Sequence, residues 1–255
     1  MVINVHAGHN PDGKIACGAV GLIKESTEAR KVKTEVISLL KSAGHTVYDC
    51  TVDNGTSQSN VLKKIVSKCN AHKVDLDVSI HFNAGANDRR GNGSTTGTEV
   101  LVYDTKGIAN ITANKICNAI SKLGYKNRGV KIRRDLYVLN STKAPALLIE
   151  CCFVDDKDDV NKYNYKTMAN AIVKGIIGTT VSSSNTTNTT KTNSFRVKII
   201  VSELNVRAGA GVSYKINRTV KKNEVFTIIE TKGNWGKLKS GAGWINISNS
   251  YCKRV

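Results

Sequence analysis

A polar, low-complexity run divides this chain of 255 residues into two unequal parts. Residues 179–194 consist almost entirely of Thr, Ser and Asn. Such a segment cannot bury enough apolar surface to fold, so we expect a flexible linker. The flanking parts, residues 1–178 and residues 195–255, each have the length of an independent domain. The chain is therefore predicted to contain two domains joined by the linker.

The first part alternates short apolar runs with longer amphipathic ones. The pattern predicts strands at 2–5, 46–50, 76–80, 99–103 and 146–149, and helices at 25–43, 59–71, 108–123 and 165–177. Core positions are expected at Val32, Val36, Leu39 and Leu40 of the first helix, and at Ile108, Ile111, Ile116, Ile120 and Leu123 of the third. This alternation predicts the α/β class, with a mostly parallel sheet and helices on both faces.

The second part contains short β-rich runs separated by Gly and Asn, at 204–207, 225–229, 237–238 and 243–247. This pattern predicts a small all-β barrel. Its twelve Lys and Arg against three Asp and Glu carry +9 of the net charge of +18, in about a quarter of the chain. Such an excess predicts an anionic partner, either a cell envelope or nucleic acid. A non-enzymatic polymer binder built on Trp235, Trp244, Tyr214 and Tyr251 is therefore one hypothesis.

The seven cysteines predict free thiols. Their number is odd and no Cys-x-x-Cys spacing occurs, which argues against a disulfide framework and a cysteine zinc site. We expect synthesis in a reducing cytoplasm. An alternative hypothesis is a cysteine hydrolase with Cys17 or Cys151 as nucleophile and His81 as base. No cysteine, however, lies in a convincing strand-to-helix turn.

Three apolar runs end in residues that can bind a metal or transfer a proton: His9, His81 and Glu150. Ligands of parallel sheets bind beyond the carboxyl ends of the strands, so these side chains should meet at one edge. Two imidazoles and a carboxylate are typical of a catalytic zinc site with one open position. Glu25 or Glu28, one helical turn apart, could supply the carboxylate. Alternatively, the two acids only interact favourably with the dipole at the helix N-terminus, and the histidines are ordinary loop residues.

Glu150 follows four apolar residues, and such surroundings should raise its pKa. A carboxyl group with a raised pKa suits proton transfer. The alternative is a buried ion pair with Arg133 or Arg134. We expect structural roles for the remaining histidines, His6, His45 and His72.

Four sequence blocks resemble the zinc-dependent N-acetylmuramoyl-L-alanine amidases of the amidase-3 type. They are His-Ala-Gly-His-Asn at 6–10, Glu-Ser-Thr-Glu-Ala-Arg at 25–30, Ser-Ile-His-Phe-Asn-Ala at 79–84 and Leu-Ile-Glu-Cys-Cys-Phe at 148–153. The resemblance implies that His9, Glu25 and His81 bind Zn²⁺ and that Glu150 is the catalytic acid and base. Glu25 is preferred to Glu28 because the family's ligand begins this helix. At position 6 the family commonly has Asp instead of His.

The second part resembles bacterial SH3-type domains, which commonly bind peptidoglycan, at residues 204–211, 234–238 and 243–245. Together the resemblances imply a lytic enzyme of Gram-positive cell walls that cleaves the amide bond between N-acetylmuramic acid and L-alanine. The expected partners are peptidoglycan and anionic wall polymers, and not nucleic acid or a membrane.

No apolar stretch reaches the roughly 18 residues of a membrane span. The N-terminus predicts a strand instead of a signal peptide. We therefore expect a protein made in the cytoplasm that acts at the wall after release, as a phage endolysin does, in preference to a secreted autolysin.

Overall fold

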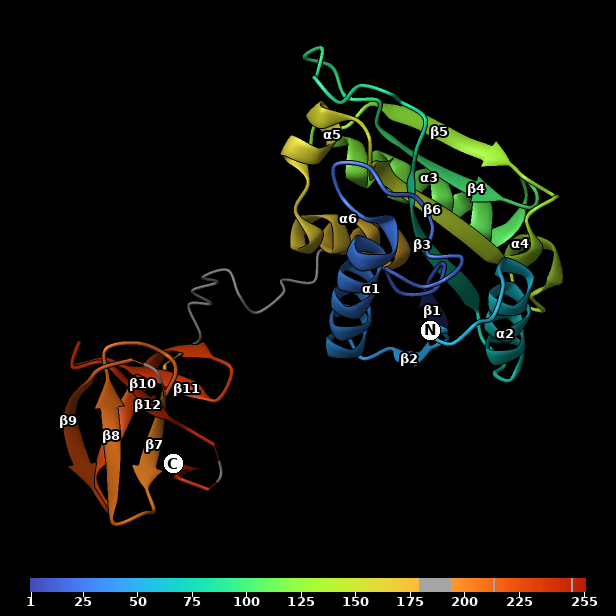
Figure 1. Ribbon diagram of the computed structural model, residues 1–255. Coiled ribbons are helices and arrows are strands. Elements are labelled where there is room, and N and C mark those ends of the chain that lie inside the picture. The colour runs from blue at the N-terminus through green and yellow to red at the C-terminus, as the bar shows by residue number, and fades with distance from the viewer. Residues whose placement is uncertain (179–193, 213, 249) are drawn as a thin grey trace. The chain divides into compact units, whose positions relative to one another are not determined.

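The computed structural model describes residues 1–178 and 194–255, except Ser213 and Asn249. The chain forms two compact units, Met1–Ser183 and Ser184–Val255, which are treated separately below (Figure 1). Apart from Ser194, the predicted linker lies outside the described residues.

A six-stranded sheet forms the centre of the first unit (Figure 1). Its order is β2-β1-β3-β6-β4-β5. The mostly parallel sheet predicted from the sequence is confirmed, and the β4–β6 pair is its antiparallel exception. The strands are β1 (Val2–Ala7), β2 (Thr46–Asp49), β3 (Leu76–Asn83), β4 (Thr98–Val102), β5 (Asn127–Ile132) and β6 (Ala146–Phe153).

Helices cover both faces of this sheet, as predicted. They are α1 (Glu25–Ser42), α2 (Gln58–Asn70), α3 (Gly107–Ser121), α4 (Tyr137–Ser141), α5 (Lys157–Lys162) and α6 (Tyr165–Ile177). The main core contains buried residues of α1, α3 and α6, and a second core contains those of α2 and α4. Successive side chains of β6 alternate between the two cores, because neighbouring residues of a strand point to opposite faces: Leu147 joins the main core and Leu148 the second.

The strands β3 and β6 are longer than predicted, and this changes where two site residues lie. The sequence pattern ended these strands at residues 80 and 149, whereas the structure continues them to Asn83 and Phe153. His81 and Glu150 therefore stand inside the strands, where the ladder hydrogen bonds hold their backbones. The structure also contains β5, α4 and α5, which are short or largely polar and gave no clear periodicity.

The predicted core of α3 is partly wrong. Ile116 and Ile120 are buried, but Ile108, Ile111 and Leu123 are exposed. The buried face of α3 consists mostly of smaller residues, such as Ala109, Thr112, Ala113 and Cys117. A Cβ atom placed on Gly175 of α6 would lie only 2.7 Å from the Ile116 Cα atom. The two helices thus pack closely, and small side chains permit this where large ones would not. On α1, all four predicted core residues are buried.

The second unit is an antiparallel all-β sheet, as expected for an SH3-like domain. Its order is β13-β7-β10-β11-β12-β8-β9. Buried side chains such as Val197, Val206, Ile228 and Ile245 form a separate core. The strands are β7 (Phe195–Ile199), β8 (Glu203–Arg207), β9 (Ile216–Lys221), β10 (Val225–Lys232), β11 (Trp235–Leu238), β12 (Trp244–Asn246) and β13 (Cys252–Arg254).

All seven cysteines are free, as predicted. Among the described residues, no helix combines the length and the apolarity that crossing a membrane requires.

The packing of α3 can be tested with two matched substitutions. Ile116→Ala should destabilise the first unit by about 2–5 kcal/mol, because it leaves a cavity between α3 and α6. Ile111→Ala, at a position that is 54% exposed, should change stability by no more than about 0.5 kcal/mol. Urea unfolding of the full chain, followed by helical circular dichroism, measures both. Equal losses for the two variants would contradict the observed orientation of α3.

Candidate active site

Three side chains from separate elements converge at the carboxyl ends of β1 and β3. His9 follows β1, Glu25 begins α1, and His81 lies in β3. Glu25 Oε1 is 3.3 Å from His9 Nε2 and 3.0 Å from His81 Nδ1. One ligand atom from each residue lies within 4.8 Å of the other two. The sequence pattern predicted that His9 and His81 lie together at this edge, and the structure brings them together with Glu25.

The two imidazole rings approach each other because glycines flank them. A Cβ atom on Gly8 would lie 1.9 Å from His81 Cε1, so no other residue fits there without moving the ring. A Cβ atom on Gly18 would lie 2.5 Å from Glu25 Oε2 and 2.8 Å from His9 Cδ2. His9 itself has a φ of 64°, a left-handed conformation that is uncommon outside glycine. Unusual backbone geometry of this kind concentrates at functional sites.

The Glu25 carboxylate is held on both of its oxygens. Oε1 accepts a hydrogen bond from the Phe82 amide at 3.2 Å, and Oε2 accepts one from the Ala19 amide at 2.7 Å. Burial alone would raise the pKa of Glu25, but the hydrogen bonds and charges of His81 and His9 outweigh it and hold the pKa well below its usual range. Burial lowers the pKa of His81. An ionised carboxylate beside a neutral imidazole suits a divalent metal such as Zn²⁺.

Glu28 does not take part in this cluster. Its Oε1 lies 2.8 Å from Lys31 Nζ, and its Oε2 accepts a hydrogen bond from the Tyr163 hydroxyl at 3.1 Å. The sequence left Glu25 and Glu28 as alternatives because they stand one turn apart. Of the two, only Glu25, at the first position of α1, contacts the histidines.

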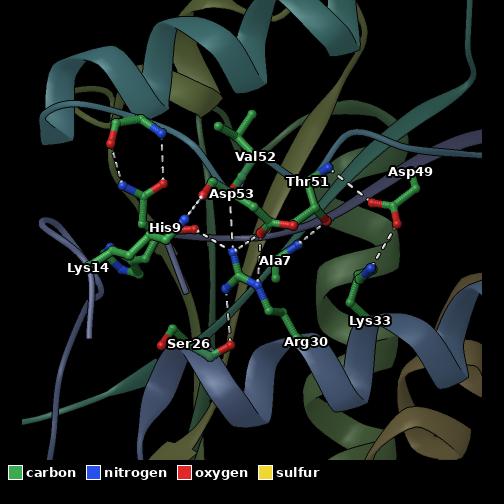
Figure 2. Close-up of polar contacts among 12 residues, drawn as sticks. Ala7, His9, Lys14, Ser26, Arg30, Lys33, Asp49, Thr51, Val52 and Asp53 are labelled. Atoms are coloured by element: carbon green, nitrogen blue, oxygen red, sulfur yellow. Dashed lines mark hydrogen bonds and ion pairs between the residues drawn. The ribbon is translucent and has the colours of Figure 1, made fainter. Parts of the chain in front are cut away.

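Arg30 anchors the backbone of His9 (Figure 2). Its Nη2 atom donates to the His9 carbonyl at 3.0 Å and to the Val52 carbonyl at 3.1 Å, while Nη1 donates to the Ser26 carbonyl at 3.1 Å. Asp53 Oδ1 lies 2.6 Å from Nη2. One guanidinium therefore ties α1 to the turn that carries His9. Sequence reasoning missed this role, since nothing along the chain links residue 30 to residue 9.

Glu150 lies next to His81 on the neighbouring strand β6, in direct register with it. Burial raises the pKa of Glu150 to about 8, and the charges of Glu25 and Glu99 contribute. The raised pKa predicted from the sequence is thus confirmed in direction. Among the described residues, Glu150 Oε2 is buried without a hydrogen-bond partner.

The alternative ion pairs of Glu150 do not form. Arg133 binds Asp135 through two nitrogens, at 2.9 and 2.7 Å. Arg134 donates instead to the Tyr103 carbonyl at 3.4 Å. The Glu150 carboxyl group therefore keeps an oxygen available for proton transfer.

The other candidates have structural surroundings. His6 is buried, which with the charge of His81 lowers its pKa to about 3, and its Nδ1 lies 3.5 Å from Ser79 Oγ. His45 contacts the N-terminal amine, and the His72 ring stacks on Tyr48. Cys151 is fully buried, which raises its pKa well above the usual value and argues against a thiolate nucleophile there.

A second acidic group, Asp88, Asp156 and Asp158, also lies close together. The Asp156 carboxylate accepts hydrogen bonds from the amides of Thr96, Asp158 and Asp159. Asp158 accepts others from Asn92 and Gly93. These contacts hold the loop between β3 and β4 against the start of α5 and give Asp156 and Asp158 a structural role.

Comparisons with known proteins agree with this architecture. A family model described as N-acetylmuramoyl-L-alanine amidase matches residues 3–179, and one described as bacterial SH3 domain matches residues 202–253. The endolysin of Bacillus phage SPP1 is 31% identical over 179 residues, 66% of this chain and 60% of that protein. An uncharacterized protein of Clostridium perfringens is 40% identical over 167 residues, 65% of this chain and 48% of that protein. The chain thus spans about half the length of this last relative.

A solved structure is similar as well. The catalytic domain of the CD27L endolysin targeting Clostridia Difficile superposes with a TM-score of 0.63 at 27% sequence identity. The match covers 71% of this chain and 99% of that domain.

The anchoring role of Arg30 predicts an effect on metal affinity. Arg30→Gln should weaken Zn²⁺ binding by about 10- to 100-fold, because residues that orient a ligand from behind contribute on that scale. Competition with a chromophoric chelator measures the affinity of the full chain. Lys33→Gln is the matched control: Lys33 lies one turn further along α1 and pairs with Asp49, at 2.7 Å (Figure 2). An equal loss of affinity in both variants would contradict the role of Arg30.

Proposed function

The chain belongs to the N-acetylmuramoyl-L-alanine amidase family, and from this premise we propose that it is a zinc-dependent peptidoglycan hydrolase. It cleaves the amide bond between the lactyl group of N-acetylmuramic acid and L-alanine. The observation that carries the proposal is the convergence of His9, Glu25 and His81 beside Glu150, a separate carboxyl group whose pKa is raised.

In this proposal His9, Glu25 and His81 hold the metal. Their donor set of two imidazoles and one carboxylate leaves a position open for water or substrate. When bound, Zn²⁺ supplies a Lewis acid that polarises the amide carbonyl and makes water more acidic. The chain itself contributes the alignment of the ligands, through Gly8, Gly18 and the Arg30 anchor.

Glu150 moves the proton. As its carboxylate, it takes a proton from the water that attacks the amide carbon. It then gives this proton to the leaving nitrogen as the carbon–nitrogen bond breaks. The products are the lactyl carboxylic acid and the free amine of L-alanine, so atoms and charge balance. A carboxyl group with a pKa near neutrality suits both steps, because it accepts and releases a proton at similar cost.

The second unit binds the cell wall in this proposal. It matches the bacterial SH3 family, and residues 195–255 carry half of the net positive charge of the chain. Lys237 Nζ lies 5.9 Å from the centre of the Trp244 ring, and Tyr214 and Tyr251 are exposed. Exposed aromatic rings on a basic domain suit a carbohydrate polymer with anionic groups. The proposed partners are peptidoglycan and anionic wall polymers, and the proposed place of action is the wall of Gram-positive cells, as for an endolysin.

Loss of the proton-transfer group should abolish hydrolysis without unfolding the chain. Glu150→Gln should lower kcat by about 10²- to 10⁴-fold, because general acid and base catalysis contributes on that scale. Removal of metal with a chelator should also abolish activity, and Zn²⁺ should restore it. Release of alanine amino groups from purified walls measures both effects. Glu28→Gln is the control, since Glu28 contacts Tyr163 and Lys31 away from the site.

Two results would contradict this function. Hydrolysis that persists in Glu150→Gln would exclude the proposed proton transfer. Activity that resists chelation but is lost on thiol alkylation would favour the cysteine hydrolase alternative, with Cys17 as the remaining nucleophile.

Wall binding by the second unit should depend on charge. The full-length Glu150→Gln protein should sediment with intact walls, and less of it should do so as salt increases or after anionic polymers are removed from the walls. Quantitative sedimentation measures the bound fraction. If polymer removal and salt have no effect, an anionic polymer is not the partner. If duplex DNA in excess displaces the protein from the walls, the nucleic-acid alternative returns.

A further inference from the structure

A row of polar side chains extends from Glu150 across the neighbouring strands. Glu99 of β4 stands directly opposite Glu150 of β6 in the antiparallel ladder, so both side chains point to the same face of the sheet. Glu99 Oε1 accepts a hydrogen bond from Asn83 Nδ2 at 3.0 Å, and Glu99 Oε2 lies 2.8 Å from Arg128 Nε of β5. The row therefore leads from the proton-transfer group to a guanidinium two strands away.

Arg128 is held in place, but only from one side. Its Nε atom contacts Glu99, and its guanidinium carbon lies 5.0 Å from the centre of the Phe153 ring. In the described part of the chain, no hydrogen bond occupies its two terminal nitrogens, and a third of the side chain is exposed to solvent. A guanidinium that is oriented by Nε and stacking can still bind a carboxylate through its Nη atoms.

The segment that carries Arg128 is basic. Residues 128–134 contain four cations, Arg128, Lys131, Arg133 and Arg134, and no acid. The ion pair with Glu99 fixes the Nε atom of Arg128 but leaves the two Nη atoms, at the outer edge of the guanidinium, without a partner in the described part of the chain. An anionic ligand is the group that this edge can bind.

The position of Glu150 indicates on which side of the site the peptide lies. The leaving nitrogen belongs to L-alanine and must come close to the group that protonates it. The peptide therefore continues on the Glu150 side, over β6, β4 and β5. On the other side, toward β1 and α2, a narrow cavity of about 20 Å³ is lined by His9, His81, Val61, Leu62 and Val138. It has room for one methyl-sized group, as the lactyl side of the substrate carries.

We propose that Arg128 binds a carboxylate of the peptide stem, on the residue that follows L-alanine. This inference rests on the proposed function. Neighbouring strands lie about 4.8 Å apart, and each extended peptide residue adds about 3.5 Å, so the second stem residue lies over β4 and within reach of Arg128. Arg128 is thus a specificity-determining residue that distinguishes a stem with a free carboxylate from one in which this group is a carboxamide.

Two soluble muropeptides test the proposal if they differ only in this group, one with a free α-carboxylate on the second stem residue and one with a carboxamide. The full chain with Zn²⁺ should hydrolyse the carboxylate substrate with a kcat/KM about tenfold higher, as a charge-assisted hydrogen bond predicts. Arg128→Gln should bring this ratio close to one, mainly through a higher KM for the carboxylate substrate. Arg128→Lys, which keeps the charge without the planar fork, should retain part of the ratio.

Arg134→Gln is the matched control, because Arg134 stands in the same basic segment but contacts Tyr103. It should keep the full ratio. The inference would be overturned if the wild-type kcat/KM ratio is one or if Arg128→Gln leaves the ratio unchanged. It would also be overturned if Arg128→Gln lowers kcat/KM equally for both substrates, and this last result would assign Arg128 a structural role only. If the wild-type protein hydrolyses neither of the two muropeptides nor wall material, the proposed function itself fails. This outcome differs from a failure of the inference about Arg128, in which hydrolysis remains.

Discussion

The contact of one carboxylate with two imidazoles is the interaction on which the site depends. Glu25 reaches His9 and His81 from the first position of α1, and its remaining hydrogen bonds come from the Phe82 and Ala19 amides. A buried carboxylate is costly unless it is paired and hydrogen-bonded. Here the pairing joins three parts of the first unit: helix α1, strand β3 and the loop that follows β1. The contacts that position the candidate ligands therefore also connect these three parts.

The polar residues of the site share one face of the central sheet. His81, Glu99 and Glu150 are register neighbours on β3, β4 and β6, and the apolar residues that alternate with them pack into the main core beneath α1, α3 and α6. The face that carries these polar residues also carries the second core, in which Leu101 and Leu148 pack with residues of α2 and α4. The strand alternation that builds the core therefore also places carboxylates and imidazoles side by side.

Much of the fold and the site could be predicted along the chain, because these features have local causes. Hydrophobic periodicity predicted α1 and β1, and apolar runs before His9 and Glu150 predicted where the sheet edge would carry polar groups. Exposed Ile111 on α3 shows the limit of the same reasoning. Periodicity identifies a helix, but its buried face depends on how closely the neighbouring helix approaches, and that distance is set by residues such as Gly175, more than fifty positions away.

The sequence by itself determined the α/β class, the all-β second part and the candidate residues His9, Glu25, His81 and Glu150. It could not choose Glu25 over Glu28 from spacing alone, nor decide whether Glu150 pairs with an arginine. Tertiary structure decided both. The rotation of α1 directs Glu25, and not Glu28, at the histidines, and the two arginines considered as partners of Glu150 bind Asp135 and the Tyr103 carbonyl instead. Contacts between distant segments, such as the hydrogen bond from Arg30 to the His9 carbonyl, leave no pattern in the sequence. The residues around Arg30 and around His9 each show only the periodicity of their own helix or strand, and this periodicity contains no information about the partner.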